Sequence, residues 1–149
     1  MKLSTKGRYG LKAMVDLAVH SQDKHIALRH IAERQDISEH YLEQLIAVLR
    51  KAGLVKSIRG AQGGYSLALS PEEITVGDIL RALEGSLAPV DCVSENPVFE
   101  CTGFNCCVTR TVWKKIGDKI NEVVDSITLQ DLIEEYEKLN HDKEYMYYI

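Results

Sequence analysis

Apolar residues in the first third of the chain recur at the spacing of α-helices. Ser4 or Thr5 can cap a first helix, and a short second helix is expected over about 28–34. Ser38 is a good N-cap for a third helix, which would stop at Gly53. The third helix presents one apolar face, made of Leu42, Leu45, Ile46 and Leu49. Two short helices joined by a tight turn are typical of a helix-turn-helix.

A β-hairpin is predicted directly after the third helix. Residues 54–58 and 65–69 alternate apolar and polar side chains and include β-branched or aromatic residues. The stretch between them is rich in glycine and suits a turn. A helix-turn-helix followed by a hairpin is a winged helix. The predicted fold class is therefore mainly α with a small β-hairpin wing, and the winged-helix domain spans 1–85.

The rest of the chain is expected to alternate between regular and irregular segments. A fourth helix opens at Thr75 and ends at Gly85. Residues 86–107 show no sustained periodicity, and such a long stretch inside a compact chain is usually functional or mobile. A long helix is predicted over 108–127. A short helix capped by Thr128, followed by a tail, makes up 128–149 and is expected to pack on the body.

Two apolar features in this half point to contacts with another chain or with the chain's own body. The long helix carries a stripe with alternating spacings of three and four, the rhythm of a two-helix seam: Trp113, Ile116, Ile120, Val123 and Ile127. It favours a homodimer, and packing on the chain's own body is the alternative. The aromatic tail, 144–149, is expected to dock on its own body or on a partner chain.

Composition and charge narrow the class of protein. The chain has 149 residues, 45% of them apolar, and no run of the roughly 18 apolar residues that a membrane span needs. Its first residues lack a signal-peptide core, so a cytoplasmic protein is expected. Residues 1–60 carry 11 basic and 6 acidic side chains, whereas 61–149 carry 7 and 16. A basic front on an acidic chain suits a nucleic-acid-binding face, although chance clustering gives the same pattern.

All four cysteines lie within 92–107, at Cys92, Cys101, Cys106 and Cys107. Without an export signal, a disulfide framework is not expected, and the clustering indicates metal or redox chemistry. Thiolates select zinc, copper(I) or iron–sulfur clusters. Paired Cys-x-x-Cys knuckles of structural zinc sites are absent, and the spacing fits no common ferredoxin run. The spacing thus predicts a thiolate site and leaves the metal open.

The winged-helix prediction places the DNA contacts. The third helix would enter the major groove with its first residues against base edges: Ser38, His40, Tyr41, Glu43 and Gln44. Gln44 can read adenine, and Glu43 can accept from cytosine while repelling phosphate. A solvated first turn is the alternative for His40 and Tyr41.

The hairpin tip and the start of the first helix are the other candidate contacts. Arg59 could enter a narrow minor groove, and Gly60 and Gly64 would let the backbone approach phosphates. A simple glycine turn is the alternative. Thr5 and Lys6 could add phosphate contacts.

Three stretches of this sequence resemble the winged-helix repressor family of IscR, NsrR and CymR. They are residues 2–10, 38–45 and 53–65. The cysteine-bearing, cluster-binding loop 86–107, called the cysteine loop below, is similar to that of IscR-type iron–sulfur regulators. The resemblance implies a homodimer with crossed long helices, a palindromic operator and a [2Fe–2S] cluster whose occupancy selects operators. It also implies that Cys92, Cys101 and Cys107 are cluster ligands and that Glu43 discriminates between operator classes.

The chain departs from the family pattern at the fourth ligand. IscR-type sites take a histidine three residues after the last cysteine, where this sequence has Arg110. Relatives that use ligands from the first helix have acidic or histidine side chains where Arg8 and Lys12 stand. Cys106 is the leading candidate for the fourth ligand, followed by Asp91, Glu100 or a partner-chain residue. The tail is more similar to CymR, which lacks this loop and works through a partner enzyme.

The sequence is thus interpreted as a DNA-binding transcriptional repressor, not an enzyme, that senses iron–sulfur status and controls cluster-biogenesis genes. A CymR-like cysteine-metabolism repressor, or a zinc or thiol redox sensor, is the alternative on the same scaffold. A small iron–sulfur electron carrier is the alternative from another class.

Overall fold

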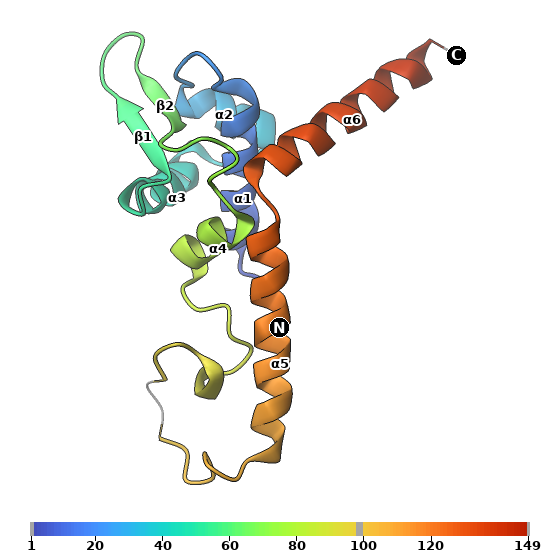
Figure 1. The fold of residues 1–149 in the computed structure, drawn as a ribbon. Coiled ribbons are helices and arrows are strands. Elements are labelled where there is room, and N and C mark those ends of the chain that lie inside the picture. Colours follow the sequence, from blue (N-terminus) through green and yellow to red (C-terminus); the bar gives the residue numbers. More distant parts are fainter. Residues whose placement is uncertain (1, 98–99, 149) are drawn as a thin grey trace.

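The computed structural model describes residues 2–97 and 100–148, and its elements follow the predicted order (Figure 1). They are α1 (Thr5–His20), α2 (Leu28–Gln35), α3 (Glu39–Lys51), β1 (Val55–Ile58), β2 (Gly64–Leu67), α4 (Val76–Glu84), the short 3₁₀ helix η1 (Asp91–Val93), α5 (Val108–Ser126) and α6 (Leu129–Tyr147). The strands form an antiparallel hairpin. The mainly α fold with a hairpin wing confirms the predicted fold class.

The helices α1 to α4 and the hairpin share one hydrophobic core, and together they are called the head below. Helix α1 packs on α2, α3, α4 and α6. The apolar face predicted for the third helix is buried, which confirms that prediction. The largest fully buried side chains are Met14, Leu17, Ile31, Leu42, Ile46, Leu49, Ile74, Ile79 and Leu129.

The hairpin is extended by a segment that the sequence did not predict. An isolated antiparallel bridge joins Ile26 to Tyr65, with hydrogen bonds of 2.8 Å in both directions. Gly64 allows this approach, because a Cβ atom there would overlap the Ile26 carbonyl. The wing therefore rests on the segment that connects α1 to α2.

Helix α5 extends away from the head, with residues 85–97 and 100–107 beside it (Figure 1). Of the chain's elements it packs mainly on α4 and η1. Arg81 of α4 donates to both carboxylate oxygens of Asp125, at 2.7 and 2.8 Å, and to Asn121 at 2.9 Å. Much of the predicted apolar stripe is exposed, including Ile116 and Val123. The stripe is thus not buried by this chain's own body.

Helix α6 corrects two predictions. Thr128 begins it through the predicted capping box with Asp131, but the helix is long, with 19 residues. Only its start is buried, at Leu129 and Ile133, and it then leaves the head (Figure 1). The tail does not pack on the body, since the residues at the end of the helix are 73–92% exposed: Tyr145, Met146, Tyr147 and Tyr148. Ile149 lies outside the described residues.

The start of α1 is capped from a distance, which also differs from the prediction. Ser4 holds the N-cap position but makes no side-chain cap. Instead, a carboxylate oxygen of Glu84 accepts from the amides of Ser4 and Gly7, at 3.0 and 3.1 Å, and from the Ser4 hydroxyl. The end of α4 thereby fixes the start of α1. In the described residues, no helix combines the length and hydrophobicity needed to span a bilayer.

Candidate nucleic-acid interface and cysteine loop

The first turn of α3 presents the predicted base-reading side chains to solvent. Ser38 caps the helix by accepting from the Tyr41 amide at 3.2 Å. His40, Glu43 and Gln44 are exposed, and Gln44 Nε2 lies 3.4 Å from His40 Nε2. These three side chains are free to meet a groove.

Tyr41 has a structural role beside the predicted one. It is only partly exposed and packs against the core. Its ring meets that of Tyr9 edge to face, with centroids 6.2 Å apart. Because Tyr41 belongs to α3 and Tyr9 to α1, this contact joins the two helices. Its ring is therefore less free to move than its exposed neighbours.

The wing tip carries an exposed arginine beside a glycine with a positive φ. Arg59 and Gly60 are both exposed, and Gly60 has a φ of 119°. Behind the tip, Arg50 of α3 donates to the Ser57 hydroxyl at 3.2 Å. This bond holds the hairpin beside α3, so the tip and the helix are parts of one surface. Thr5 and Lys6 are exposed at the start of α1.

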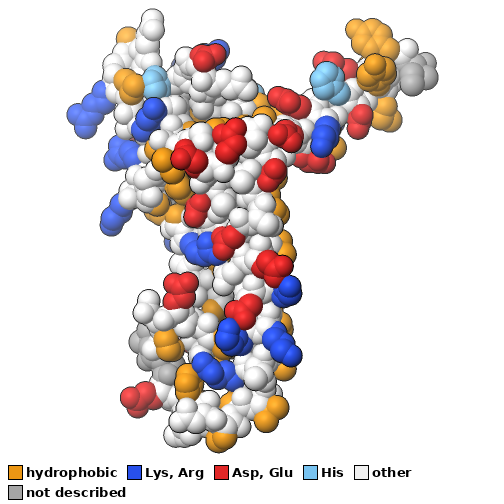
Figure 2. Space-filling model, in the orientation of Figure 1, with side chains coloured by type: hydrophobic (Ala, Val, Ile, Leu, Met, Phe, Trp, Pro, Cys, Tyr) orange, Lys and Arg blue, Asp and Glu red, His pale blue; other side chains and the backbone are white. Residues whose placement is uncertain are grey.

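Basic and acidic side chains occupy different regions of the face shown in Figure 2. Figure 2 shows Lys and Arg side chains gathered over the hairpin side of the head, whereas Asp and Glu cover its centre and much of α6. A basic side that also holds the wing and the exposed first turn of α3 suits the phosphate backbone.

The cysteine loop holds four free thiols that differ in exposure. Cys92 lies in η1 and is half-buried, whereas Cys101, Cys106 and Cys107 are exposed. Cys107 is also the N-cap residue of α5. Within residues 2–97 and 100–148, no three His, Cys, Asp or Glu side chains come close enough together to hold a metal ion. The structure therefore does not bring Cys92, Cys101 and Cys107 together.

These residues fit a [2Fe–2S] cluster by the chemistry of their donors. Four thiols on one irregular segment supply the soft ligands that iron–sulfur clusters require. Three of them are exposed, so no buried contact fixes them away from a shared site. The donor chemistry of this segment therefore suits an iron–sulfur cluster.

The Cys107 thiol is set apart by its surroundings. The Thr109 hydroxyl lies 3.2 Å from its sulfur. That contact, backbone amides at the start of α5 and the charge of Arg110 lower the pKa of Cys107 below its ordinary value. A thiolate at a helix N-terminus is the form that binds soft metals.

Arg110 ties the two ends of the cysteine loop together. Its Nε donates to the Cys92 carbonyl at 3.4 Å, and its guanidinium lies 4.0 Å from the centroid of the Phe104 ring. A guanidinium carries no lone pair for a metal, so Arg110 organises the loop rather than ligating. The sequence placed Arg110 where a histidine was expected but gave no sign of these contacts.

Comparison with known proteins identifies the family. The model of the Rrf2 family, described as iron-dependent transcriptional regulators, matches residues 3–135. The chain belongs to the Rrf2 family. It is therefore a transcriptional regulator and not an enzyme, as the sequence predicted.

Rrf2 relatives of two kinds match the chain. It is 46% identical to the regulator CymR of Bacillus subtilis, over all of both chains. It is 44% identical to the regulator IscR of Aliivibrio salmonicida, over 89% of this chain and 77% of that one. The solved structure of T. potens IscR has a TM-score of 0.76 and 54% identity, covering 93% of this chain and 90% of that chain. The predicted resemblance to the IscR, NsrR and CymR group is confirmed.

Proposed function

We propose that this regulator is a homodimeric repressor that senses iron–sulfur status in the cytoplasm and controls cluster-biogenesis genes. Cys92, Cys101 and Cys107 would hold a [2Fe–2S] cluster, with Cys106 as the candidate fourth ligand. The observation that carries the proposal is four free thiols on the segment that leads into α5, in a chain 54% identical to T. potens IscR.

The DNA-binding half would use α3 and the wing together. Gln44, Glu43 and His40 would meet base edges in the major groove, with Ser38 and Tyr41 setting the first turn. Arg59 would enter the adjoining minor groove. A homodimer presents two such surfaces related by a twofold axis, which suits a palindromic operator.

The exposed stripe on α5 supports the dimer. Val123 is 55% exposed and Ile116 is 36% exposed, with Ile120 between them. An apolar face that the chain's own body leaves open is best explained by a second copy of the same helix.

The loop is placed to influence that pairing. Arg110 lies in the first turn of α5 and contacts both Cys92 and Phe104, so a change in loop conformation reaches α5 directly. A bound cluster would supply thiolate coordination that favours one loop conformation. The cluster can shift the equilibrium between two loop conformations only as far as its affinities for them differ. The spacing of the two α3 helices across the dimer would shift with it.

Purification without air tests the iron–sulfur proposal. Brown protein with stoichiometric iron and sulfide is expected, and substituting serine for Cys92, Cys101 and Cys107 should remove the colour while leaving the far-UV spectrum unchanged. Cys106→Ser is the matched variant, and loss of colour there would identify the fourth ligand. Colourless protein with neither iron nor sulfide would refute the proposal.

A second candidate function follows from the tail. The chain matches B. subtilis CymR over its full length, and the aromatic end of α6 is exposed. A CymR-like cysteine-metabolism repressor would use this end to bind an enzyme partner. The CymR-like function would be favoured if the protein is colourless and binds an enzyme partner, and if replacing Tyr147 and Tyr148 abolishes that binding. Colourless protein containing zinc would favour a zinc or thiol sensor instead.

A further inference from the structure

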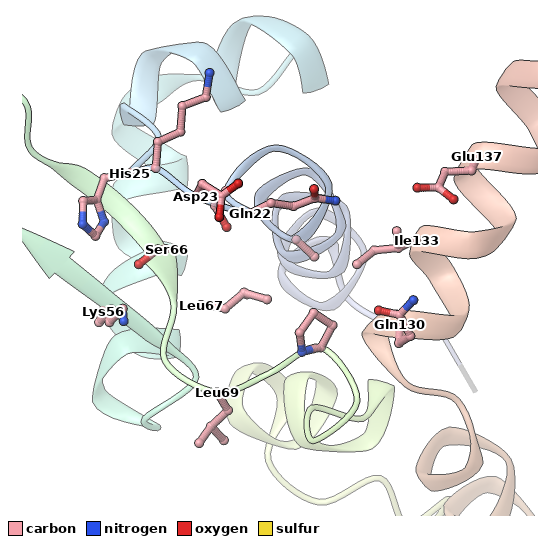
Figure 3. Close-up of a pocket in the computed structure, with 14 residues that line it drawn as sticks. Gln22, Asp23, His25, Lys56, Ser66, Leu67, Leu69, Gln130, Ile133 and Glu137 are labelled. Atoms are coloured by element: carbon pink, nitrogen blue, oxygen red, sulfur yellow. The ribbon is translucent and has the colours of Figure 1, made fainter.

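A cavity of about 630 Å³ lies between the hairpin, the segment joining α1 to α2, and the first half of α6. Figure 3 shows His25, Ser66 and Lys56 on the hairpin side, with Gln130, Ile133 and Glu137 of α6 across from them. None of the residues that line this cavity belongs to the cysteine loop.

The hairpin wall carries a row of three hydrogen-bond donors. Ser66 of β2 pairs directly with Lys56 of β1. The bridge from Ile26 to Tyr65 sets the register on the other side, so His25 lies opposite Ser66. Residues directly opposite on neighbouring strands share a face of the sheet. An ammonium, a hydroxyl and an imidazole are thus neighbours on one surface.

Two members of this row each carry a buried polar atom without a partner. Ser66 is 7% exposed, and within the described residues neither its Oγ nor Nδ1 of His25 has a hydrogen-bond partner. A buried polar atom left unpaired is unfavourable, and a bound molecule that hydrogen-bonds to it would remove that cost. Ser66 shares its face of the hairpin with the exposed Lys56, whereas the core packs on the opposite face, which carries Val55.

The cavity lining carries two acidic and two basic side chains. Glu137 of α6 and Asp23 line it, and they balance Lys56 and Lys24. A simple anion would meet the donor row but would be repelled by the two carboxylates. A molecule with a carboxylate at one end and an ammonium at the other satisfies both sides, because Glu137 and Asp23 accept from the ammonium.

We propose that this cavity binds a small zwitterion, with its carboxylate on the row of His25, Ser66 and Lys56 and its ammonium toward Glu137 and Asp23. The ligand connects the wing to α6, so its binding alters how the wing tip sits on the head. Regulation by this ligand is separate from the cysteine loop, and the binding itself does not depend on the proposed iron–sulfur function.

Titration of the isotope-labelled full-length protein, followed at each amide by NMR, tests the site. The probes are glycine, β-alanine, γ-aminobutyrate and ε-aminocaproate, which are zwitterions of increasing length. Propionate, propylamine and inorganic phosphate are the single-charge controls. Saturable shifts are expected at residues 22–25, 65–67 and 130–137 with at least one zwitterion, and weaker ones with the controls.

Three variants sharpen the test. Ser66→Ala should weaken the best zwitterion about tenfold, as expected for a lost hydrogen bond to a charged group. It should not lower the Tm, because the hydroxyl is unpaired without ligand. Glu137→Gln should weaken zwitterions but not propionate, whereas Glu135→Gln on α6, outside the cavity, should change nothing. The proposal fails if no zwitterion gives saturable shifts. It also fails if phosphate or propionate binds as tightly, or if binding survives Ser66→Ala and Glu137→Gln unchanged.

Discussion

Arg34 of α2 forms an ion pair with the buried carboxylate of Asp16 in α1. Its Nε donates to one oxygen at 2.9 Å and its second nitrogen to the other at 2.6 Å, while Gln35 adds a bond of 2.8 Å. The Asp16 side chain is 1% exposed, so these donors compensate for its lost hydration. The ion pair fixes α2 on α1, and α2 leads directly into α3. The orientation of α3 therefore depends on a contact outside it.

Removing Arg34 should destabilise the head. Arg34→Ala leaves a buried carboxylate with fewer donors, and we expect a loss of about 2–3 kcal/mol, because the guanidinium itself is one-third exposed. Urea unfolding followed by circular dichroism measures this loss. Arg29→Ala, an exposed arginine on the same helix, should cost under about 0.5 kcal/mol. Equal losses in both variants would contradict the assigned role.

The periodicity of apolar residues was sufficient to predict most elements, because each helix of the head buries one face. Gly53, the Thr128 capping box and the Gly-rich hairpin are local signals, and the structure confirms each. The cap that Glu84 places on α1 joins residues 80 positions apart, and no local pattern encodes it. The same holds for the bridge between Ile26 and Tyr65.

The length of α6 was missed for a different reason. Beyond Ile133 its apolar residues, such as Leu139 and Tyr145, are exposed, so no buried stripe marks the helix in the sequence. The exposed first turn of α3 and the wing tip were predictable, since they follow from the winged-helix pattern. The positions of the four thiols were not, because the loop has no period to fix the direction of a side chain. The donor row with Ser66 needed the sheet register.

Close packing of α1 on α4 predicts a second destabilised variant. A methyl group at Gly10 would overlap the Leu83 side chain. We expect Gly10→Ala to cost about 1–3 kcal/mol through overpacking, measured as a lower midpoint of urea unfolding. Gly103→Ala is the control, because a Cβ atom there has open space. A Gly10→Ala protein as stable as wild type would show that the two helices can separate at little cost.

A charge in the exposed stripe of α5 should break the dimer. Val123→Glu places a carboxylate on the proposed seam, where burial against a second copy is unfavourable. The variant should be a folded monomer by light scattering, because Val123 is 55% exposed within its own chain. Lys114→Glu, which changes charge at another exposed position of the helix, should remain dimeric. A dimeric Val123→Glu protein would place the interface elsewhere.

The link between α4 and α5 should weaken in acid. The hydrogen bonds from Arg81 lower the pKa of Asp125 below its ordinary value. A carboxylate whose pKa is lowered by folding stabilises the protein at pH values above its unfolded pKa of about 4. That stabilisation is lost as the pH falls through the folded pKa. Asp125→Asn should therefore cost under about 1 kcal/mol at neutral pH, since the pair is partly exposed, and nothing in strong acid. A difference from wild type that is constant with pH would contradict this.

Arg59 at the wing tip should contribute to operator affinity and not to stability, because its side chain is exposed. If it enters a narrow minor groove, Arg59→Ala should weaken operator binding by about 1–3 kcal/mol and relax preference at the base pairs beneath the wing. If it touches phosphate only, all sequences should weaken alike and the salt dependence should fall by about one ion. Fluorescence anisotropy at several salt concentrations, on operator and scrambled duplexes, separates the two. Lys138→Ala on α6 removes the same charge away from this surface and should leave both affinities unchanged. Unaltered binding by Arg59→Ala at moderate salt would show that the wing does not reach DNA through this side chain.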